Sequence, residues 1–226
     1  MVLSWIVFVC VKLKKKQSKM RTEKTSNAIN IAIMASGEGT NAENIIQYFE
    51  PFLDANIGCV ISNKEDAGVI KRVRRYKVPT YSTPWYKEID QILTQHNIHY
   101  IVLAGFTDKL PPNFCKKYQW KIINIHPALL PKHGGKGMYG DNVHRSVKMS
   151  GDKKTGISVH FVNQEYDAGT VIFQKEIKVE EHETWQEIKS RVHDLEMKFY
   201  PKIVEKLIYG TYKYLYEKET EQNAKR

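Results

Sequence analysis

The stretch "INIHPALLP" (residues 123–131) runs an apolar strand directly into polar residues and a turn. Side chains of a strand alternate between its two faces, so Asn124 and His126 point to one side and Ile125 to the other. Pro127 then turns the chain. On this pattern alone, the two polar side chains are either a functional pair or an ordinary strand end that meets water.

Short apolar runs alternate with amphipathic stretches on both sides of this strand. The predicted strands are residues 29–35, 57–62, 79–82, 100–105, 121–126, 156–162 and 170–179. The predicted helices are residues 42–49, 67–76, 85–97 and 184–210, the last interrupted or kinked near Pro201. This alternation predicts an α/β fold, a doubly wound and mostly parallel sheet with helices on both faces.

Ligands of such open sheets bind beyond the carboxyl ends of the strands. Three loops leave predicted strand ends: "SGEGTN" (36–41), "GFTDKL" (105–110) and "NIHPALLP" (124–131). We expect them to meet at one edge of the sheet, which favours a functional role for Asn124 and His126.

The loop "SGEGTN" links a strand to a helix. Gly37 and Gly39 permit close approach of a ligand to the backbone, and Thr40 and Asn41 lie where the helix begins, so N–H groups there favour a phosphate. The loop lacks the third glycine of a dinucleotide fingerprint and the lysine of a Walker loop. The alternative is a tight turn with a Thr or Asn cap.

Asp167 lies in the loop "NQEYDAGTVI" (163–172) between two predicted strands. It is either a turn aspartate, with Gly169 supplying a positive φ, or a third member of the candidate site. A histidine beside a carboxylate is more easily kept protonated, so Asn124, His126 and Asp167 could together stabilise an oxyanion and manage a proton.

Other features bound the class of protein. The glycine-rich segment "HGGKGMYGDNVH" (133–144) predicts a mobile loop that is either a lid or a plain connector. No His, Cys and acid grouping has metal-ligand spacing, so no metal site is expected. The three cysteines give no disulfide framework, which favours a reducing compartment.

The ends carry much of the charge. Residues 1–27 hold seven cations and one anion, so they supply +6 of the net charge of +10 over 226 residues. The remainder suits anionic small molecules rather than nucleic acid. The N-terminal apolar run is too short to span a membrane. We expect translation to start at Met20; a weak surface anchor and a disordered tail are the alternatives. The expected division is an extension (1–28), a catalytic domain (29–210) and a charged tail (211–226).

Five segments in this order resemble the phosphoribosylglycinamide formyltransferase family: "SGEGTN", "SNKEDAG", "VLAGF", "INIHPALLP" and "HFVNQEYDAGTVIFQ". The resemblance covers about residues 29–209, and "KHGGKGMYGDNVH" (132–144) is similar to a Bacteroidetes-type variant. It implies formyl transfer from 10-formyltetrahydrofolate, a co-substrate, to the amine of glycinamide ribonucleotide in purine (IMP) biosynthesis. It also implies a cytoplasmic monomer or homodimer with no bound cofactor or metal, no nucleic acid partner and no membrane span.

The resemblance also implies roles for individual residues. Asn124 and His126 would donate to the tetrahedral oxyanion, and Asp167 would hold His126 charged and help to move the proton. Ribonucleotide binding is expected from Gly39, Thr40, Asn41, His193 and Glu196. Folate binding is expected from Thr107, Asp108, Lys109, Leu110, Asn124, Asn163, Gln164, Glu165, Tyr166 and Asp167. Family members often carry Arg or another long residue at the position of Asp108 or Lys109, so side-chain contacts in that loop are left open.

Four alternatives remain. Methionyl-tRNA formyltransferases normally carry a further C-terminal RNA-binding domain, and formyltetrahydrofolate deformylases an N-terminal regulatory domain; neither is expected here. A sugar-nucleotide amine formyltransferase would use the same three residues. A nucleotide-binding module without catalysis would need the glycine loop but not Asn124, His126 and Asp167 together.

Overall fold

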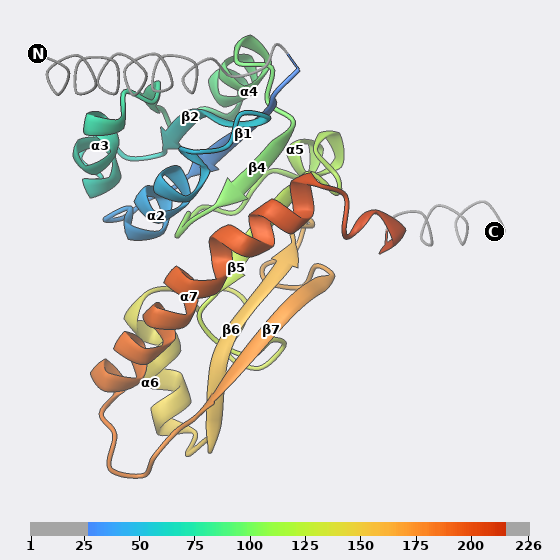
Figure 1. The fold of residues 1–226 in the computed structure, drawn as a ribbon. Helices are drawn as coiled ribbons and strands as arrows, with labels where there is room; N and C mark the ends of the chain where they lie inside the picture. Colours follow the sequence, from blue (N-terminus) through green and yellow to red (C-terminus); the bar gives the residue numbers. More distant parts are fainter. Residues whose placement is uncertain (1–26, 216–226) are drawn as a thin grey trace, which may run out of the picture.

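Residues 27–215, which the computed structural model describes, form a seven-stranded sheet with the order β3-β2-β1-β4-β5-β6-β7 (Figure 1). The strands are β1 (Ile29–Met34), β2 (Ala55–Ser62), β3 (Thr80–Ser82), β4 (Tyr100–Leu103), β5 (Ile122–His126), β6 (Lys154–Phe161) and β7 (Val171–Lys178). The first five in chain order pair in parallel, and β6 is antiparallel to both β5 and β7. The prediction of a mostly parallel sheet is confirmed.

Helices cover both faces of the sheet. In β1, Ile31 and Ile33 pack into one core cluster while Ala32 and Met34 pack into the other, and all four are fully buried. A strand covered on both faces reads as a continuous apolar run, as "INIAIM" does. On one face lie α2 (Thr40–Phe49), α3 (Gly68–Val73), α6 (Asp141–Met149) and α7 (Trp185–Ile208); on the other lie α4 (Tyr86–Gln95) and α5 (Pro112–Lys117). The predicted doubly wound arrangement is therefore confirmed.

The helix α7 is continuous through Pro201, so of the two possibilities predicted there, an interruption or a kink, the interruption is wrong. Proline has no N–H, and the carbonyl four residues earlier, that of Met197, therefore lacks its usual helical partner. The side chain of Asn44 in α2 supplies one, because its Nδ2 donates to Met197 O at 2.8 Å. Packing of α2 against α7 thus compensates for the proline.

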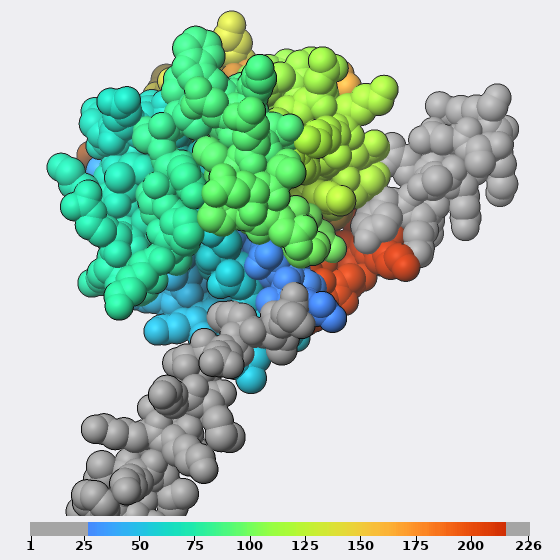
Figure 2. Space-filling view, turned by 90° about the horizontal axis from the view of Figure 1, so that it is seen from above, coloured from blue at the N-terminus to red at the C-terminus, as the bar shows by residue number. Residues whose placement is uncertain are grey.

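The two ends of the described chain lie at the same side of the molecule, where the blue start and the red end are seen close together (Figure 2). Tyr212, beyond the expected domain boundary at residue 210, is buried with the core. The expected start at Met20, the expected extension (1–28) apart from residues 27–28, and residues 216–226 of the expected tail lie outside the described part. Within residues 27–215, no helix is both long and apolar enough to cross a membrane.

Candidate active site

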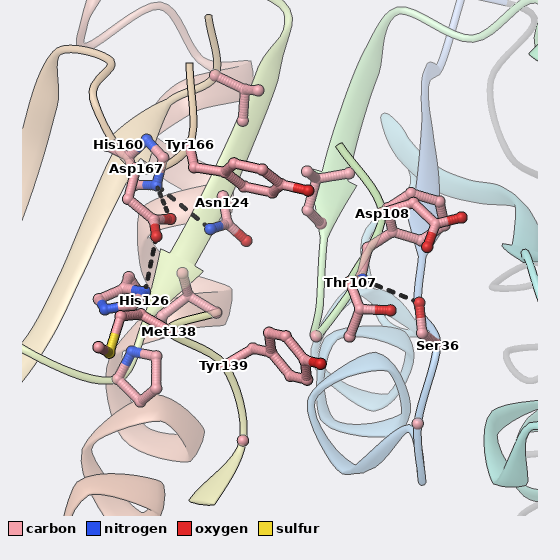
Figure 3. A pocket seen from close by; sticks show the side chains of 18 of the residues that line it. Ser36, Thr107, Asp108, Asn124, His126, Met138, Tyr139, His160, Tyr166 and Asp167 are labelled. Carbon is pink, nitrogen blue, oxygen red and sulfur yellow. Dashed lines mark hydrogen bonds and ion pairs between the residues drawn. The ribbon is translucent and has the colours of Figure 1, made fainter. Parts of the chain in front are cut away.

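A pocket of about 500 Å³ opens at the carboxyl ends of β1, β4 and β5. The loops that leave these strands line it together with the β6–β7 loop, α6 and α7 (Figure 3). The three loops expected at one edge of the sheet thus meet there. The lining includes all three residues of the candidate catalytic group, Asn124, His126 and Asp167.

Ser36 joins the loops that follow β1, β2 and β4. Its N–H donates to Gly105 O at 3.0 Å, its hydroxyl donates to Asn63 Oδ1 at 2.6 Å, and that hydroxyl accepts from the N–H of Thr107 at 3.0 Å. Ser36 is buried, so these bonds form away from solvent. These bonds hold the loops that follow β1, β2 and β4 together beside the pocket.

Gly39 is a structural glycine behind the pocket. It has φ 77°, and a Cβ there would lie 2.6 Å from the Cβ of Val69 in α3, so only glycine fits. It is the N-cap residue of α2, and no side chain caps the helix, so the alternative of a Thr or Asn cap is wrong. Gly37 lines the pocket, whereas Gly39 and Thr40 do not.

Asn41 and His193 meet at the carboxylate of Glu196. Glu196 Oε2 accepts from Asn41 Nδ2 at 2.9 Å and lies 3.1 Å from His193 Nδ1. This hydrogen bond raises the pKa of His193 and favours its cationic form. Two buried atoms beside this group, Asn41 Oδ1 and His144 Nδ1, have no hydrogen-bond partner within the described residues. Both residues line this end of the pocket.

Asp167 stands between two histidines (Figure 3). Its carboxylate oxygens lie 3.5 Å from His126 Nδ1 and 3.6 Å from His160 Nε2, and Oδ2 accepts from the N–H of Gly135 at 3.0 Å. Burial alone would raise the pKa of Asp167, but its polar neighbours, among them the N–H of Gly135, outweigh the burial and lower that pKa. Asp167 is therefore an ionised acceptor in the pocket wall.

The backbone of this loop differs from the turn considered for it. The residue with positive φ is Asp167 itself, at 52°, and not Gly169. Gly169 is required for another reason, because a Cβ there would lie 1.8 Å from the carbonyl oxygen of Phe161. Asp167 thus has a left-handed backbone conformation, which aspartate tolerates better than most residues, and its side chain lies between His126 and His160.

Burial opposes the positive charge that the resemblance implies for His126. Its side chain is 3% exposed, and this burial lowers its pKa although Asp167 and the carbonyl of His133 raise it. The nitrogen Nε2 donates to His133 O at 2.8 Å, which leaves Nδ1 facing Asp167. Neutral His126 with two surrounding acceptors is arranged to take up a proton rather than to hold one permanently.

Asn124 is oriented by His160, its partner in the pairing of β5 with β6. His160 Nδ1 lies 2.8 Å from Phe161 O, a pure acceptor, so Nδ1 carries the proton and Nε2 is free to accept. Nε2 accepts from Asn124 Nδ2 at 3.2 Å. The amide nitrogen of Asn124 is thereby held on this side and keeps a second N–H for a ligand.

The loops expected to bind folate close one end of the pocket. Lys109 Nζ lies 3.1 Å from Glu165 Oε2 and 5.6 Å from the ring centre of Tyr166. Beneath them, the thiol of Cys115 donates to Asn163 O at 3.3 Å. The predicted residues that line the pocket are Asn41, Thr107, Asp108, Lys109, Leu110, Asn124, His126, Asn163, Glu165, Tyr166, Asp167, His193 and Glu196; Gln164 is outside the lining.

Several lining residues are not among the expected site residues. They include Ser36, Met138, Tyr139, His144 and His160. The alternation of "GISVHFV" places His160 in a strand, but its contact with Asn124 depends on the register of β6 with β5. Within the described part of the chain, no group of three or more His, Cys, Asp or Glu side chains is arranged to hold a metal ion.

The chain matches the family model "Formyl transferase" over residues 29–204. It is 33% identical to a phosphoribosylglycinamide formyltransferase of Bacillus subtilis over 78% of this chain and 93% of that protein. It is 32% identical to a chloroplastic one of Arabidopsis thaliana over 77% of this chain, but covers less than two thirds, 63%, of that protein.

Among solved structures, the phosphoribosylglycinamide formyltransferase of Anaplasma phagocytophilum superposes with a TM-score of 0.73 at 32% identity. The match covers 79% of this chain and 86% of that one. The sequence match and the structural match therefore both cover the part of the chain that forms the pocket. The chain belongs to the formyl transferase family, in its phosphoribosylglycinamide formyltransferase branch.

Proposed function

We propose that this protein transfers a formyl group from 10-formyltetrahydrofolate to the amine of glycinamide ribonucleotide, a step of purine biosynthesis. The observation that carries the proposal is the convergence of Asn124, His126 and Asp167 in one pocket at the end of β5. The names of the relatives support formyl transfer and glycinamide ribonucleotide as the acceptor.

In this reaction the ribonucleotide amine attacks the formyl carbon, and a tetrahedral oxyanion forms. The free N–H of Asn124 donates to this oxygen, while its other N–H is bound by His160. A donor fixed before the reaction stabilises the developing charge without reorganisation. The role proposed for Asn124 is therefore that of the oxyanion donor.

The proton lost by the attacking amine passes to His126. Protonation at Nδ1 gives an imidazolium that faces Asp167 on one side and donates to His133 O on the other. The carbon–nitrogen bond to the folate then breaks, and the same proton goes to the leaving nitrogen. His126 and Asp167 act as one unit in this scheme, and the lowered pKa of His126 suits a proton acceptor.

The two substrates occupy opposite parts of the pocket in this proposal. Asn41, His193 and Glu196 bind the ribonucleotide, with Gly39 and Thr40 contributing through the position of the α2 N-terminus. The folate lies between residues 107–110 and 163–167, where lining side chains and backbone frame the ring; Gln164 belongs to the second loop but does not line the pocket. The folate is a co-substrate, with no further cofactor or metal bound.

The proposal extends to the cellular compartment, the oligomeric state and the partners of the enzyme. The two described cysteines, Cys59 and Cys115, are buried free thiols, which suits a reducing compartment such as the cytoplasm. We propose a monomer or homodimer that acts on small molecules without nucleic acid.

The test is a comparison of amine acceptors with the purified protein. We expect formyl transfer from 10-formyltetrahydrofolate to glycinamide ribonucleotide, and none to a nucleotide-linked amino sugar. Release of formate without any amine would instead identify a deformylase. Transfer to the amino sugar alone would identify a sugar-nucleotide formyltransferase, and either result contradicts the proposal.

A further inference from the structure

The segment His133–Gly135 contacts both members of the proton-accepting pair. His133 O accepts from His126 Nε2 at 2.8 Å, and the N–H of Gly135 donates to Asp167 Oδ2 at 3.0 Å. Three consecutive residues thus hold the histidine from one side and the carboxylate from the other. This segment opens the glycine-rich stretch 133–144, for which a mobile lid or a connector was expected, and its first residues have a defined place.

The backbone of this segment is in an unusual conformation. His133 has φ 58° and Gly135 has φ 100°. Glycine adopts such values readily, but for histidine a positive φ is uncommon and carries strain. A strained residue keeps its conformation only when its surroundings hold it there. The contacts of the His133 side chain therefore hold this backbone conformation in place.

The ring of His133 is held at both nitrogens. Nδ1 lies 2.8 Å from Ser146 Oγ in α6, and Nε2 lies 2.6 Å from Asp152 Oδ2 in the turn before β6. The side chain is 8% exposed. Asp152 also pairs with the exposed Lys132. The hydrogen bond from His133, together with Lys132, lowers the pKa of Asp152 and keeps it an ionised acceptor.

We propose that His133 is a positioning residue: Asp152 and Ser146 clamp its ring so that its carbonyl fixes the Nε2–H tautomer of His126. A buried histidine exchanges its proton between two nitrogens, and the partner of one nitrogen decides the state of the other. With Nε2–H bound to His133 O, the basic nitrogen is Nδ1, which faces Asp167. The clamp thereby directs the transferred proton to the nitrogen beside the carboxylate.

Two variants release the clamp in different ways. His133→Asn removes the ring but retains a residue type that tolerates a left-handed backbone. Asp152→Asn removes the charge that holds the ring. Lys132→Met is the matched control, because it removes the other, exposed partner of Asp152 and leaves the His133 contacts in place. Ser146→Ala, which removes a single bond, serves if a stronger variant does not fold.

The first readout is the tautomer of His126, measured in the ligand-free protein by ¹⁵N NMR of the imidazole nitrogens. We expect the Nε2–H form in the wild type and in Lys132→Met, and a mixture with the Nδ1–H form in His133→Asn and Asp152→Asn. This measurement needs no turnover, so it decides the proposal even if the protein does not transfer formyl groups.

The second readout rests on the proposed function. Mispositioning of a reacting group costs about 10- to 100-fold in kcat, so we expect such a loss in the two clamp variants. KM for both substrates should stay within about threefold, since no binding contact is removed. An unchanged tautomer in folded clamp variants, or a kcat equal to that of Lys132→Met, would overturn the proposal.

Discussion

The coupling of His126 to Asp167 can be tested by a double-mutant cycle. The perturbations are His126→Ala and Asp167→Asn; the second removes the charge but keeps an oxygen for the N–H of Gly135. His126 Nδ1 and Asp167 Oδ2 are 3.5 Å apart. Unit charges at that separation attract by about 5 kcal/mol at an effective dielectric constant of ~20. The attraction counts only while His126 is protonated.

The rate effect should be smaller than this upper figure. Asp167 also binds the N–H of Gly135, so this group stabilises its charge as well. If about half of the attraction is lost in Asp167→Asn, kcat falls by roughly 100-fold. Loss of the general base in His126→Ala should cost roughly 10²- to 10⁴-fold. Both variants should retain near-native KM values, because the pair acts on a transferred proton.

The assay is kcat for formyl transfer in the wild type, both single variants and the double variant, with folding checked by circular dichroism. The carboxylate has no imidazolium to stabilise once His126 is gone, so the double variant should be little slower than the slower single variant. If the two losses multiply, the residues act independently and the coupled mechanism is wrong.

The pH dependence of kcat offers a second test of the coupling between His126 and Asp167. A base works only when neutral, so kcat should fall as pH drops through the pKa of His126, which burial places below 6.5. Asp167 raises that pKa, so Asp167→Asn should lower it further and move the acidic limb of the kcat profile to lower pH. A shift of this limb to higher pH would refute the assignment of His126 as the base.

Three further changes follow from particular contacts. Gly37→Ala adds a methyl group in open space at the pocket wall, so it should raise KM for the ribonucleotide at unchanged thermal stability. Gly39→Ala places a methyl group against Val69 and should lower the free energy of unfolding by about 1–3 kcal/mol. Equal effects of the two variants on stability would contradict this reading. Burial lowers the pKa of His144 to about 4 from 6.5, so between these pH values the unfolded chain binds more protons than the folded protein. The free energy of unfolding should therefore fall by about 2 kcal/mol from pH 7 to pH 5. In thermal melts His144→Gln should reduce this loss, and an unaltered loss would exclude His144 as its source. Asn44→Ala leaves Met197 O without its donor and should cost about 1–3 kcal/mol in denaturant unfolding; an unchanged midpoint would show that Pro201 needs no such compensation.

The sequence was sufficient where local periodicity decides the structure. Alternation along β5 places Asn124 and His126 on one side, and the order of strands and helices predicts the edge at which they meet other loops. Asp167 and Glu196 were expected at the site from the resemblance, and the fold brings both to the pocket.

The remaining features depend on partners distant in the chain. His160 reaches Asn124 through the register of an antiparallel pair, and His133 meets Asp152 across 19 residues. Neither contact has a local signal, so the glycine-rich segment reads as a loop without an anchor. The lowering of the His126 pKa by burial could not be predicted, because a nearby carboxylate can be inferred from a motif, whereas the degree of burial cannot.

The central claim is that a formyl group moves to the ribonucleotide amine at the end of β5. The most direct measurement follows ¹³C-labelled formyl carbon from 10-formyltetrahydrofolate by NMR, with wild-type protein and with Asn124→Ala at matched folding. We predict that the label appears in the amide of formylglycinamide ribonucleotide, and that Asn124→Ala slows this by about 10²- to 10³-fold. Label that appears only as formate, or transfer at the wild-type rate by the variant, would contradict the account.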